Sequence, residues 1–372
     1  MKRKLNVALI GHKFMGKAHS NALRQVAHVF DLDVEPIMKV LCGVGDDLEE
    51  TAEKYGWETV EPDWKEVVSN PEIDCISICT PGALHAEIAI EAAKNGKHIL
   101  CEKPLSNTLQ ESKNMTNAVN AAGVVNVCNF VYRKAPAVIL AKKLIEEGKL
   151  GNIQHYRALY MQDWAAYEKG GFVWRFDNAA SGGGALADMG SHIIDLGRFL
   201  VGEYDEVTGM DKIMIPYKEN PSTGVKTEVT SNDCGDFLAS FKNGATGVFQ
   251  TSRISVGRKN WLDFEINGSL GSIHWNLERM DELEIYIKDD SEINGFRTVV
   301  VTEPYHSYIK AWWPSGHIIG WEHLFVHQYY EFFRGIAEGN RNTTTTFEDG
   351  LKTQQVIEGL FQSSKTKQWV KI

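Results

Sequence analysis

Short apolar runs alternate with longer helix-like stretches over the first 130 residues. The apolar runs are rich in Val, Ile and Cys and have no polar face, which is typical of buried strands in a parallel sheet. The candidate strands are residues 5–10, 37–42, 74–80, 98–101 and 124–128, and the candidate helices are residues 48–55, 83–95 and 109–122. This alternation predicts a Rossmann-type, doubly wound α/β domain over residues 1–130.

The pattern changes after residue 151 to longer alternating strands with hairpin signals. Asn243-Gly244 separates two such runs, as expected for a hairpin turn. The candidate strands are residues 236–241, 246–251, 262–266, 272–276, 283–288 and 297–301, with a helix over 185–201 and a short polar loop over 343–346. We expect residues 131–372 to form an α+β domain with a large, mostly antiparallel sheet that binds substrate and forms oligomers.

Composition excludes several classes of protein. The chain has 39 Lys and Arg against 49 Asp and Glu, a formal charge of −10, which disfavours nucleic acid and anionic membranes as partners. No stretch approaches 18 apolar residues, and the basic N-terminus lacks a full signal-peptide core. The six cysteines form no CxxC motif and are too few for a disulfide framework. We therefore expect a cytoplasmic protein.

The first candidate strand runs into a glycine-containing turn where a helix should begin. Gly11 and Gly16 frame Lys13, Phe14 and Met15. Glycines at such a turn let the backbone approach a pyrophosphate, whose charge is met by free amides and the helix dipole. Lys13 replaces the middle glycine of the usual G-x-G-x-x-G motif, so a tight turn without a ligand is the alternative.

The second candidate strand lacks the acid that usually binds the ribose of NAD. Asp46 and Asp47 come later, after Gly45, and could bind the cofactor or lie in a solvated loop before a helix. No basic residue follows this strand to bind a 2′-phosphate. The sequence therefore favours NAD over NADP.

Polar residues follow two further strands at the predicted carboxyl edge of the sheet, where such folds bind ligands. They are Thr80 and Pro81 with His85, and Glu102 with Lys103. Pro104 restricts Lys103 to an extended conformation, which gives its ammonium group a fixed direction. The alternatives are an ordinary strand exit for Lys103 and a capping or packing role for His85.

The predicted helix over 185–201 carries a polar line beside its apolar stripe. Asp188, His192 and Asp195 are spaced by four and three residues. A carboxylate and an imidazole at this spacing suit general acid or base chemistry, although a structural hydrogen-bonded pair would look the same. We expect no metal, because a further His or Cys ligand cannot be identified.

Residues 305–327 are rich in aromatic and histidine side chains, including Trp312 and His317. Flat aromatic faces beside polar groups suit a sugar ring, and Trp174 and Arg175 allow the same interpretation. Packing in the core or at a subunit interface is the alternative. Pro314, Gly316 and Gly320 exclude one continuous helix here.

Taken together, these blocks resemble the Gfo/Idh/MocA family of oxidoreductases over nearly the whole chain. The blocks are residues 11–16, Thr80-Pro81 with His85, residues 96–105, and residues 182–195. The aromatic segment and residues 15–20 resemble the branch that contains levoglucosan dehydrogenases and glycoside 3-dehydrogenases. Gly82, where asparagine is frequent, Lys13 and the absent acid depart from the family pattern.

The resemblance implies roles for individual residues. Lys103, Asp188 and His192 would surround the nicotinamide and the reacting carbon. The implied cofactor contacts are Gly11, Lys13, Phe14, Met15, Gly16, Asp46, Thr80, Pro81, His85, Glu102 and Lys103. The implied substrate contacts are Lys103, Tyr132, Arg133, Trp174, Arg175, Asp188, His192, Trp312 and His317.

The resulting hypothesis is an NAD-dependent dehydrogenase that oxidises a secondary hydroxyl of a sugar, anhydrosugar, glycoside or cyclitol. His192 would accept the hydroxyl proton, Lys103 would stabilise the developing alkoxide, and Asp188 would orient the groups. The alternatives are an NAD-assisted glycosidase or lyase and a non-catalytic NAD or sugar sensor. We expect a homo-oligomer, a dimer or a tetramer, formed through the C-terminal sheet.

Overall fold

The computed structural model describes residues 2–167, 171–288, 292–342 and 345–372. The chain divides into two compact units. The first unit contains Met1–Lys134 and Gly320–Lys352, and the second contains Ala135–Ile319 and Thr353–Ile372. Residues 320–352, predicted from the sequence to lie in the C-terminal domain, belong to the first unit. The functional assignment of the two domains stays a prediction.

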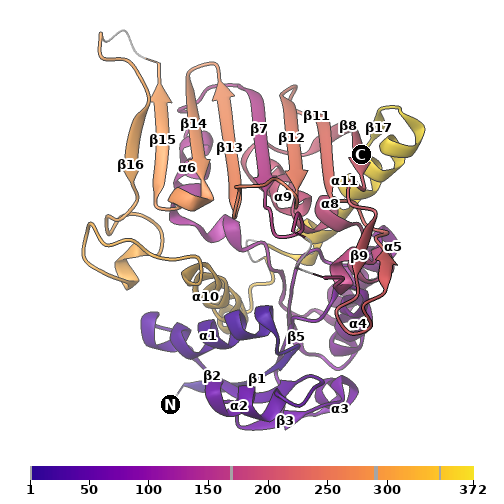
Figure 1. Cartoon of the computed structure of the whole chain (residues 1–372). Coiled ribbons are helices and arrows are strands. Elements are labelled where there is room, and N and C mark those ends of the chain that lie inside the picture. The colour runs from indigo at the N-terminus through magenta and orange to yellow at the C-terminus, as the bar shows by residue number, and fades with distance from the viewer. Residues whose placement is uncertain (1, 168–170, 289–291, 343–344) are drawn as a thin grey trace. The chain divides into compact units, whose positions relative to one another are not determined.

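The first unit is built on a six-stranded parallel sheet in the order β3-β2-β1-β4-β5-β6 (Figure 1). Its strands are β1 (Arg3–Ile10), β2 (Val34–Cys42), β3 (Thr59–Glu61), β4 (Cys75–Ile78), β5 (His98–Cys101) and β6 (Asn126–Cys128). Its helices are α1 (Phe14–Val29), α2 (Leu48–Tyr55), α3 (Trp64–Ser69), η1 (Gly82–Leu84), α4 (His85–Lys94), α5 (Leu109–Ala122), η2 (Val131–Lys134) and α10 (His323–Glu338). The predicted Rossmann-type sheet is confirmed.

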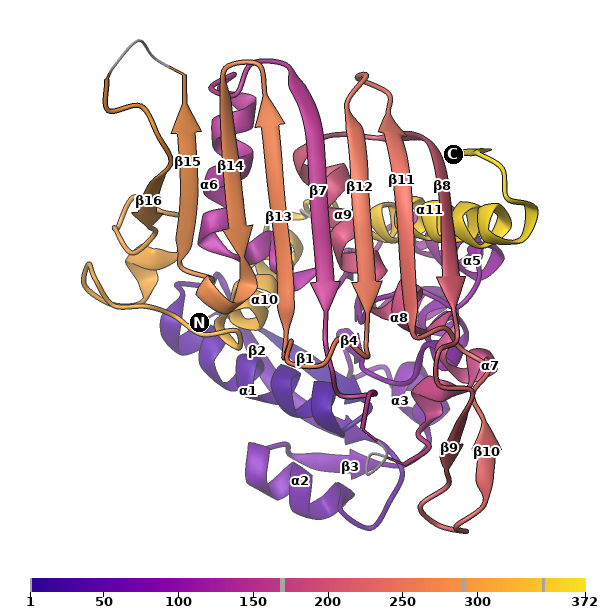
Figure 2. The ribbon, with the colours of Figure 1, turned by 45° about the horizontal axis from the view of Figure 1, so that its top comes forward.

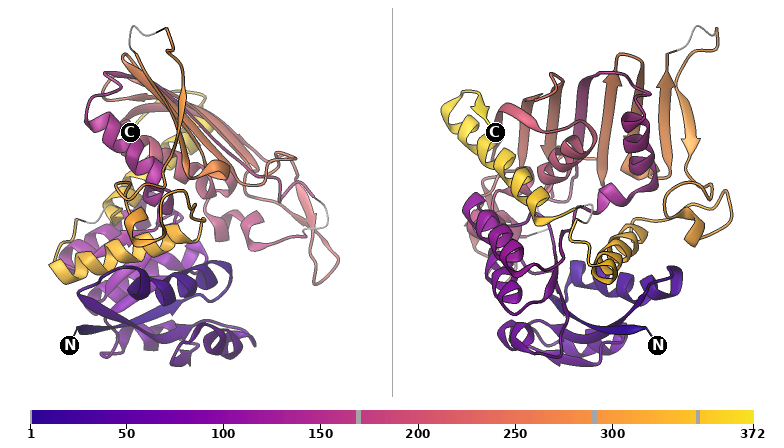
Figure 3. Two further views of the ribbon diagram at one scale, coloured as in Figure 1. Left: turned by 90° about the vertical axis from the view of Figure 1, so that its left-hand side faces the viewer. Right: turned by 180° about the vertical axis from the view of Figure 1, so that it is seen from behind.

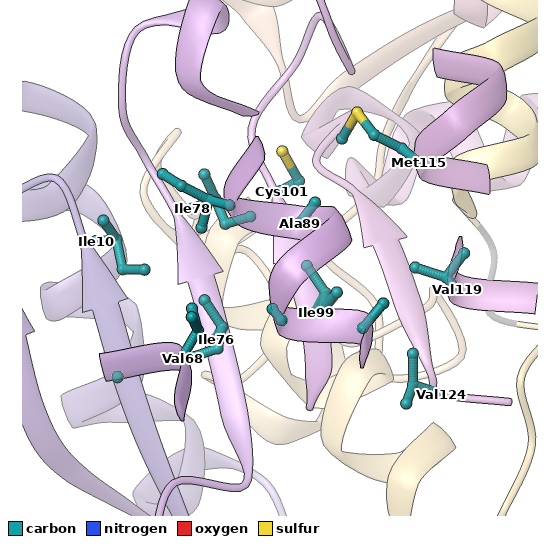
Figure 4. Close-up of a cluster of buried hydrophobic side chains, with 14 of the residues drawn as sticks. Ile10, Val68, Ile76, Ile78, Ala89, Ile99, Cys101, Met115, Val119 and Val124 are labelled. Carbon is teal, nitrogen blue, oxygen red and sulfur yellow. The ribbon is translucent and has the colours of Figure 1, made fainter. Parts of the chain in front are cut away.

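Burial of both faces explains why these strands lack a polar side. All four residues of β4 are buried, and Ile76 and Ile78 pack with Ile99 of β5 and Ala89 of α4 (Figure 4). Helices over both faces of a parallel sheet leave no strand face in water, so every strand position favours an apolar side chain. The sheet is thereby a rigid base for the polar residues that follow its strands.

The second unit is built on a nine-stranded sheet in the order β16-β15-β14-β13-β7-β12-β11-β8-β17. Its strands are β7 (Ile153–Met161), β8 (Tyr204–Lys212), β11 (Cys234–Phe241), β12 (Thr246–Ser252), β13 (Trp261–Gly268), β14 (Gly271–Asn276), β15 (Glu282–Ile287), β16 (Arg297–Val300) and β17 (Val370–Lys371). Only β7 and β12 pair in parallel among the described strands of this sheet. The predicted hairpin around Asn243-Gly244 is confirmed as β11 and β12.

Helices cover one face of this sheet. Figure 2 shows α6 (Pro136–Glu146), α8 (Gly184–Asp188) and α9 (Gly190–Leu200) behind the strands, and Figure 3 (right) shows α6 and α9 from the opposite side. The other elements are η4 (Trp174–Phe176), α7 (Asn178–Ser181), the pair β9 (Tyr217–Glu219) and β10 (Lys226–Glu228), η5 (Leu277–Arg279), η6 (Ile309–Ala311) and α11 (Phe347–Thr366), whose first residues belong to the first unit.

The prediction of one helix over 185–201 is wrong in detail. Met189 separates α8 from α9, and the amide of His192 bonds back only three residues, to the Met189 carbonyl at 3.2 Å. Asn232 fixes α8 from outside, because its carbonyl and side-chain oxygens accept the amides of Ala185 and Leu186. Gly190 follows the break, and glycine weakens a helix interior by about 1 kcal/mol relative to alanine.

The polar loop expected over 343–346 includes residues 343–344, which lie outside the described residues. Across the described part of the chain, no helix combines the length and apolarity needed to cross a membrane.

Candidate functional site

The turn after β1 leaves no room for side chains at its two glycines. Gly11 has φ +104°, and a Cβ added there would lie 2.6 Å from the Cys79 carbonyl oxygen. A Cβ on Gly16 would lie 2.0 Å from the Gly11 oxygen. The helix α1 begins at Phe14 with no side-chain cap and no acid in its first turn. Close backbone packing and uncapped amides are what a pyrophosphate site requires.

Lys13 is tied to the loop that follows β2. Its ammonium donates to Asp47 Oδ1 at 2.5 Å, and His12 Nε2 lies 2.9 Å from the same oxygen. Bonding to Lys13 and His12 holds the pKa of Asp47 well below its usual range. Asp47 is thus the acid that lies against the glycine turn, whereas Asp46, the residue chosen from the sequence, is exposed. The cofactor role of Asp46 stays a prediction.

The exit from β4 carries Thr80, Pro81 and His85. The hydroxyl of Thr80 is buried and has no hydrogen-bond partner among the described residues. His85 is buried, with Nε2 2.9 Å from the Thr80 carbonyl oxygen and Nδ1 3.1 Å from that of Pro104. Burial lowers its pKa. The imidazole therefore links the loops after β4 and β5, which fits the structural alternative for His85.

The exit from β5 carries Glu102 and Lys103. Glu102 is buried, and its Oε2 accepts the backbone amide of Lys103 at 3.2 Å. Its Oε1 lies 2.8 Å from His19 Nε2 and accepts from Asn129 Nδ2 at 2.6 Å. Both carboxylate oxygens of Glu102 are therefore used by groups of the first unit.

The residues that complete this network were not predicted from the sequence. Tyr329 of α10 places its hydroxyl 2.9 Å from His19 Nδ1 and 2.7 Å from the Ser77 hydroxyl. Phe325, one turn earlier on α10, packs edge-on against the His19 ring at 5.3 Å. His19 lies on α1, five residues after Phe14, and is buried. A polar residue at a buried position of the helix that follows the glycine turn is a local signal that could have identified it. Tyr329 gave none, because it lies 252 residues from Ser77.

Asp188 and Arg175 approach each other in the second unit. Arg175 Nε lies 3.9 Å from Asp188 Oδ2, and both side chains are a little over one-third exposed. The guanidinium of Arg175 also lies over the Trp174 ring, 4.4 Å from its centroid. The structure therefore brings three of the predicted substrate-binding residues together, at the ends of η4 and α8.

His192 and Asp195 lie on α9 and are more buried than Asp188. His192 is 7% exposed, and its ring packs against that of Tyr160 with the centroids 5.7 Å apart. Asp195 is 1% exposed. The predicted line of polar groups is therefore divided, because Asp188 ends α8 while the other two belong to α9.

The remaining predicted substrate residues lie apart in the chain. Tyr132 and Arg133 are buried in η2, where Arg133 pairs with Asp349 at 3.2 Å. Trp312 follows η6 with its ring 6.5 Å from that of Trp313, and His317 is exposed with Nδ1 2.9 Å from the Pro314 oxygen. No single helix runs through this segment, as predicted.

The aromatic segment also reaches the glycine turn. Trp321, which belongs to the first unit, stacks on Phe14 with the ring centroids 6.0 Å apart and the planes 8° apart. Phe14 is 66% exposed. The stacking contact with Trp321 therefore helps to hold the exposed ring of Phe14, one of the predicted cofactor contacts, in place. Within the described ranges, no cluster of three His, Cys, Asp or Glu side chains could hold a metal ion.

The residues present fit a dinucleotide. The glycine turn admits a close backbone approach, α1 offers uncapped amides, and the buried Thr80 hydroxyl is available for a further hydrogen bond. These features agree with the comparison to known families. Residues 5–130 match the oxidoreductase family with an NAD-binding Rossmann fold, and residues 138–274 match the GFO/IDH/MocA C-terminal domain.

Individual relatives cover from about three quarters to nearly all of the chain. Levoglucosan dehydrogenase of Pseudarthrobacter phenanthrenivorans is 39% identical over an alignment of 384 positions, gaps included, that covers 99% of this chain and 98% of the relative. The scyllo-inositol 2-dehydrogenase (NAD(+)) of Bacillus subtilis is 32% identical over 73% of this chain and 74% of its own.

Solved structures show the same similarity over the full length of the chain. A levoglucosan dehydrogenase in complex with NADH and levoglucosan has a TM-score of 0.96 and 40% identity, with 100% of both chains covered. An oxidoreductase domain protein from Kribbella flavida has a TM-score of 0.96 and 42% identity, again with 100% of both chains covered. With an NAD-binding Rossmann domain and a matching C-terminal domain, this chain belongs to the Gfo/Idh/MocA family of oxidoreductases.

Proposed function

We propose that this protein is an NAD-dependent dehydrogenase that oxidises a secondary hydroxyl of a sugar, anhydrosugar, glycoside or cyclitol to a ketone. The observation that carries the proposal is the full-length similarity to levoglucosan dehydrogenase, structures of which hold NADH with levoglucosan or L-sorbose. The similarity to inositol dehydrogenases supports the wider substrate class. The first domain binds the cofactor and the second binds the carbohydrate.

Three residues carry the chemistry in this proposal. His192 accepts the proton of the substrate hydroxyl, because a neutral imidazole is a suitable base near pH 7. Lys103 stabilises the developing alkoxide with its ammonium charge, and Asp188 orients the substrate. When bound, NAD accepts the hydride that leaves the alcohol carbon. Loss of the proton from the hydroxyl and of the hydride from the carbon converts the alcohol to the ketone.

The binding residues divide between the cofactor and the substrate. Gly11 and Gly16 allow the pyrophosphate to approach the backbone, and Phe14 and Met15 are the first residues of α1 beside it. The loops after β4 and β5 hold the nicotinamide end of the cofactor. Trp174 and Arg175 beside Asp188 offer an aromatic face and a cation to the carbohydrate. Tyr132, Arg133, Trp312 and His317 are the further proposed substrate contacts.

A screen of sugars, anhydrosugars and inositols with NAD and with NADP tests the proposal. The expected result is formation of NADH, followed at its absorbance band, with at least one free carbohydrate. Release of an aglycone without net NADH would instead identify an NAD-assisted glycosidase or lyase. Binding of NADH and a sugar with no turnover would identify a sensor.

We also propose a homo-oligomer formed through the uncovered face of the large sheet. Leu238 and Val248 are about half exposed on this face and pair in register, and Met210 lies two strands from Val248. Light scattering of the wild type and of Leu238→Glu tests this. The wild type should have the mass of a dimer or tetramer, and the variant should dissociate. A monomeric wild type contradicts the proposal.

A further inference from the structure

The buried carboxylate of Glu102 directly precedes Lys103. Its Oε2 accepts the backbone amide of Lys103 at 3.2 Å. Its Oε1 takes one hydrogen bond from Asn129 at 2.6 Å and lies 2.8 Å from His19 Nε2. The carboxylate thus joins the ends of β5 and β6 to α1 at the point where the main chain of Lys103 leaves the sheet.

The ionised carboxylate of Glu102 fixes the direction of the hydrogen bonds that it takes. It can only accept, so His19 donates to it from Nε2. His19 Nδ1 lies 2.9 Å from the hydroxyl of Tyr329. The same hydroxyl lies 2.7 Å from that of Ser77, so a chain of polar contacts runs from Glu102 through His19 and Tyr329 to β4.

The network is closed to water and keeps its charge. His19, Ser77 and Tyr329 are fully buried, and Glu102 is 5% exposed. Burial alone would raise the pKa of Glu102, but the hydrogen bond to His19 and its electrostatic effect, the nearby charge of Lys103 and the hydrogen bond from Asn129 hold it below its ordinary value. A fixed negative charge therefore lies beside Lys103. A buried charge with its partners satisfied is rigid, since any displacement would break strong hydrogen bonds.

We propose that Glu102 and His19, held by Tyr329 and Ser77, form the positioning device for Lys103. Glu102 fixes the main chain of Lys103, and His19 fixes Glu102. Both Glu102 oxygens accept hydrogen bonds within this network, so Glu102 acts as a positioning residue. The role of the device rests on the proposed function of Lys103.

Substitutions at Glu102 and His19 test the device. Glu102→Gln keeps the shape but removes the charge, and kcat should fall by about 10²-fold, the cost expected for a misplaced reacting group. His19→Ala should have a similar effect. His19→Gln should recover much of the loss, because its amide can still donate to Glu102. The substrate is levoglucosan or scyllo-inositol, whichever the wild type oxidises, and the Kd for NADH should change little.

A second readout does not depend on turnover. Acetylation of Lys103 by an amine-reactive ester at pH 8, followed by peptide mass spectrometry, reports how accessible its side chain is to the reagent. Labelling should be several-fold faster in Glu102→Gln, because the main chain of Lys103 is held less firmly and its side chain becomes more accessible. If no carbohydrate is oxidised, the proposed function fails, but the labelling rates still test the device.

Lys97 provides a matched control at the opposite end of β5. Its buried ammonium donates to the carbonyls of Asn70 and Ile73, both at 2.7 Å. Lys97→Met therefore removes a buried polar anchor next to the same strand. Its Tm should fall while kcat and the labelling of Lys103 stay at wild-type values.

The proposal is overturned if Glu102→Gln and His19→Ala lower the Tm but leave kcat and Lys103 labelling as in the wild type. If neither variant folds, Tyr329→Phe decides, because it removes one hydroxyl and keeps the ring. It should lower kcat several-fold and speed labelling of Lys103. A Tyr329→Phe protein that is unchanged in both respects also overturns the proposal.

Discussion

His274 should make the stability of the second unit depend on pH between neutral and alkaline conditions. Its Nε2 lies 2.8 Å from Asp263 Oδ2 and its Nδ1 lies 2.7 Å from Glu284 Oε2. The three side chains come from the adjacent strands β13, β14 and β15. Hydrogen bonding to Asp263, and then the further contacts with the two carboxylates, raise the pKa of His274 to about 9 against the desolvation that lowers it.

The structure gives the size and the sign of the effect. The interval between the ordinary pKa of 6.5 and about 9 corresponds to a ceiling of about 3.4 kcal/mol at about 1.36 kcal/mol per pH unit. His274 is 28% exposed and Glu284 36%, so solvent screening reduces the expected contribution to about 1–2 kcal/mol. The folded state holds its proton more tightly than the unfolded state. The contribution is therefore complete below pH 6.5 and is lost as the pH rises through about 9.

Thermal unfolding of the wild type and of His274→Gln from pH 6 to pH 10 tests this. The difference in Tm should be largest near pH 6 and shrink by roughly 2–8 °C by pH 10, at about 2–4 °C per kcal/mol for a unit of this size. Subtracting the Tm of the variant from that of the wild type at each pH cancels the contribution of other groups that titrate in the same range. A difference that is equal at pH 6 and pH 10, or an NMR titration of His274 with its midpoint near 6.5, would refute the reasoning.

Four further outcomes are expected. Gly11→Ala should weaken NADH binding at least tenfold in a fluorescence titration, because its Cβ would meet the Cys79 carbonyl 2.6 Å away. The wild type should use NAD better than NADP, and Asp47→Ser should raise the ratio of kcat/KM for NADP to that for NAD, since it removes the acid that lies against the glycine turn. His192→Ala should lower kcat by about 10² to 10⁴ with NADH binding unchanged, and wild-type kcat/KM should fall at acid pH as the imidazole is protonated. Trp312→Ala should raise KM for the carbohydrate; a change in oligomeric mass alone would favour the packing alternative.

Elements with local end signals could be predicted from the sequence. Helix α5 has the predicted bounds, because Thr108 forms a capping box with Glu111 and Gly123 ends the helix in the left-handed conformation. Helix α2 likewise has the predicted bounds and ends at Gly56. The hairpin at Asn243-Gly244 was predicted for the same reason, since two adjacent residues specify the turn.

Features that depend on distant residues could not be predicted. The separate start of α8 depends on Asn232, which lies more than forty residues along the chain and accepts the amides of Ala185 and Leu186. The parallel pairing of β7 with β12 has no local signal. At the candidate site, the glycine turn and Lys103 were recognised from short motifs, but the hydrogen bond between Tyr329 and His19 depends on how the chain returns.

That return of the chain has a consequence for synthesis. Helix α10 packs on α1 and η2, and its Tyr330 stacks on Phe30 at 4.3 Å while Phe332 and Phe333 are fully buried. A ribosome makes α1 about 300 residues before α10. The NAD-binding unit therefore lacks part of its core until most of the chain has been made, and a nascent chain that stops at Lys134 exposes the apolar surface that α10 covers. The unit that is begun first on the ribosome is among the last parts able to finish folding.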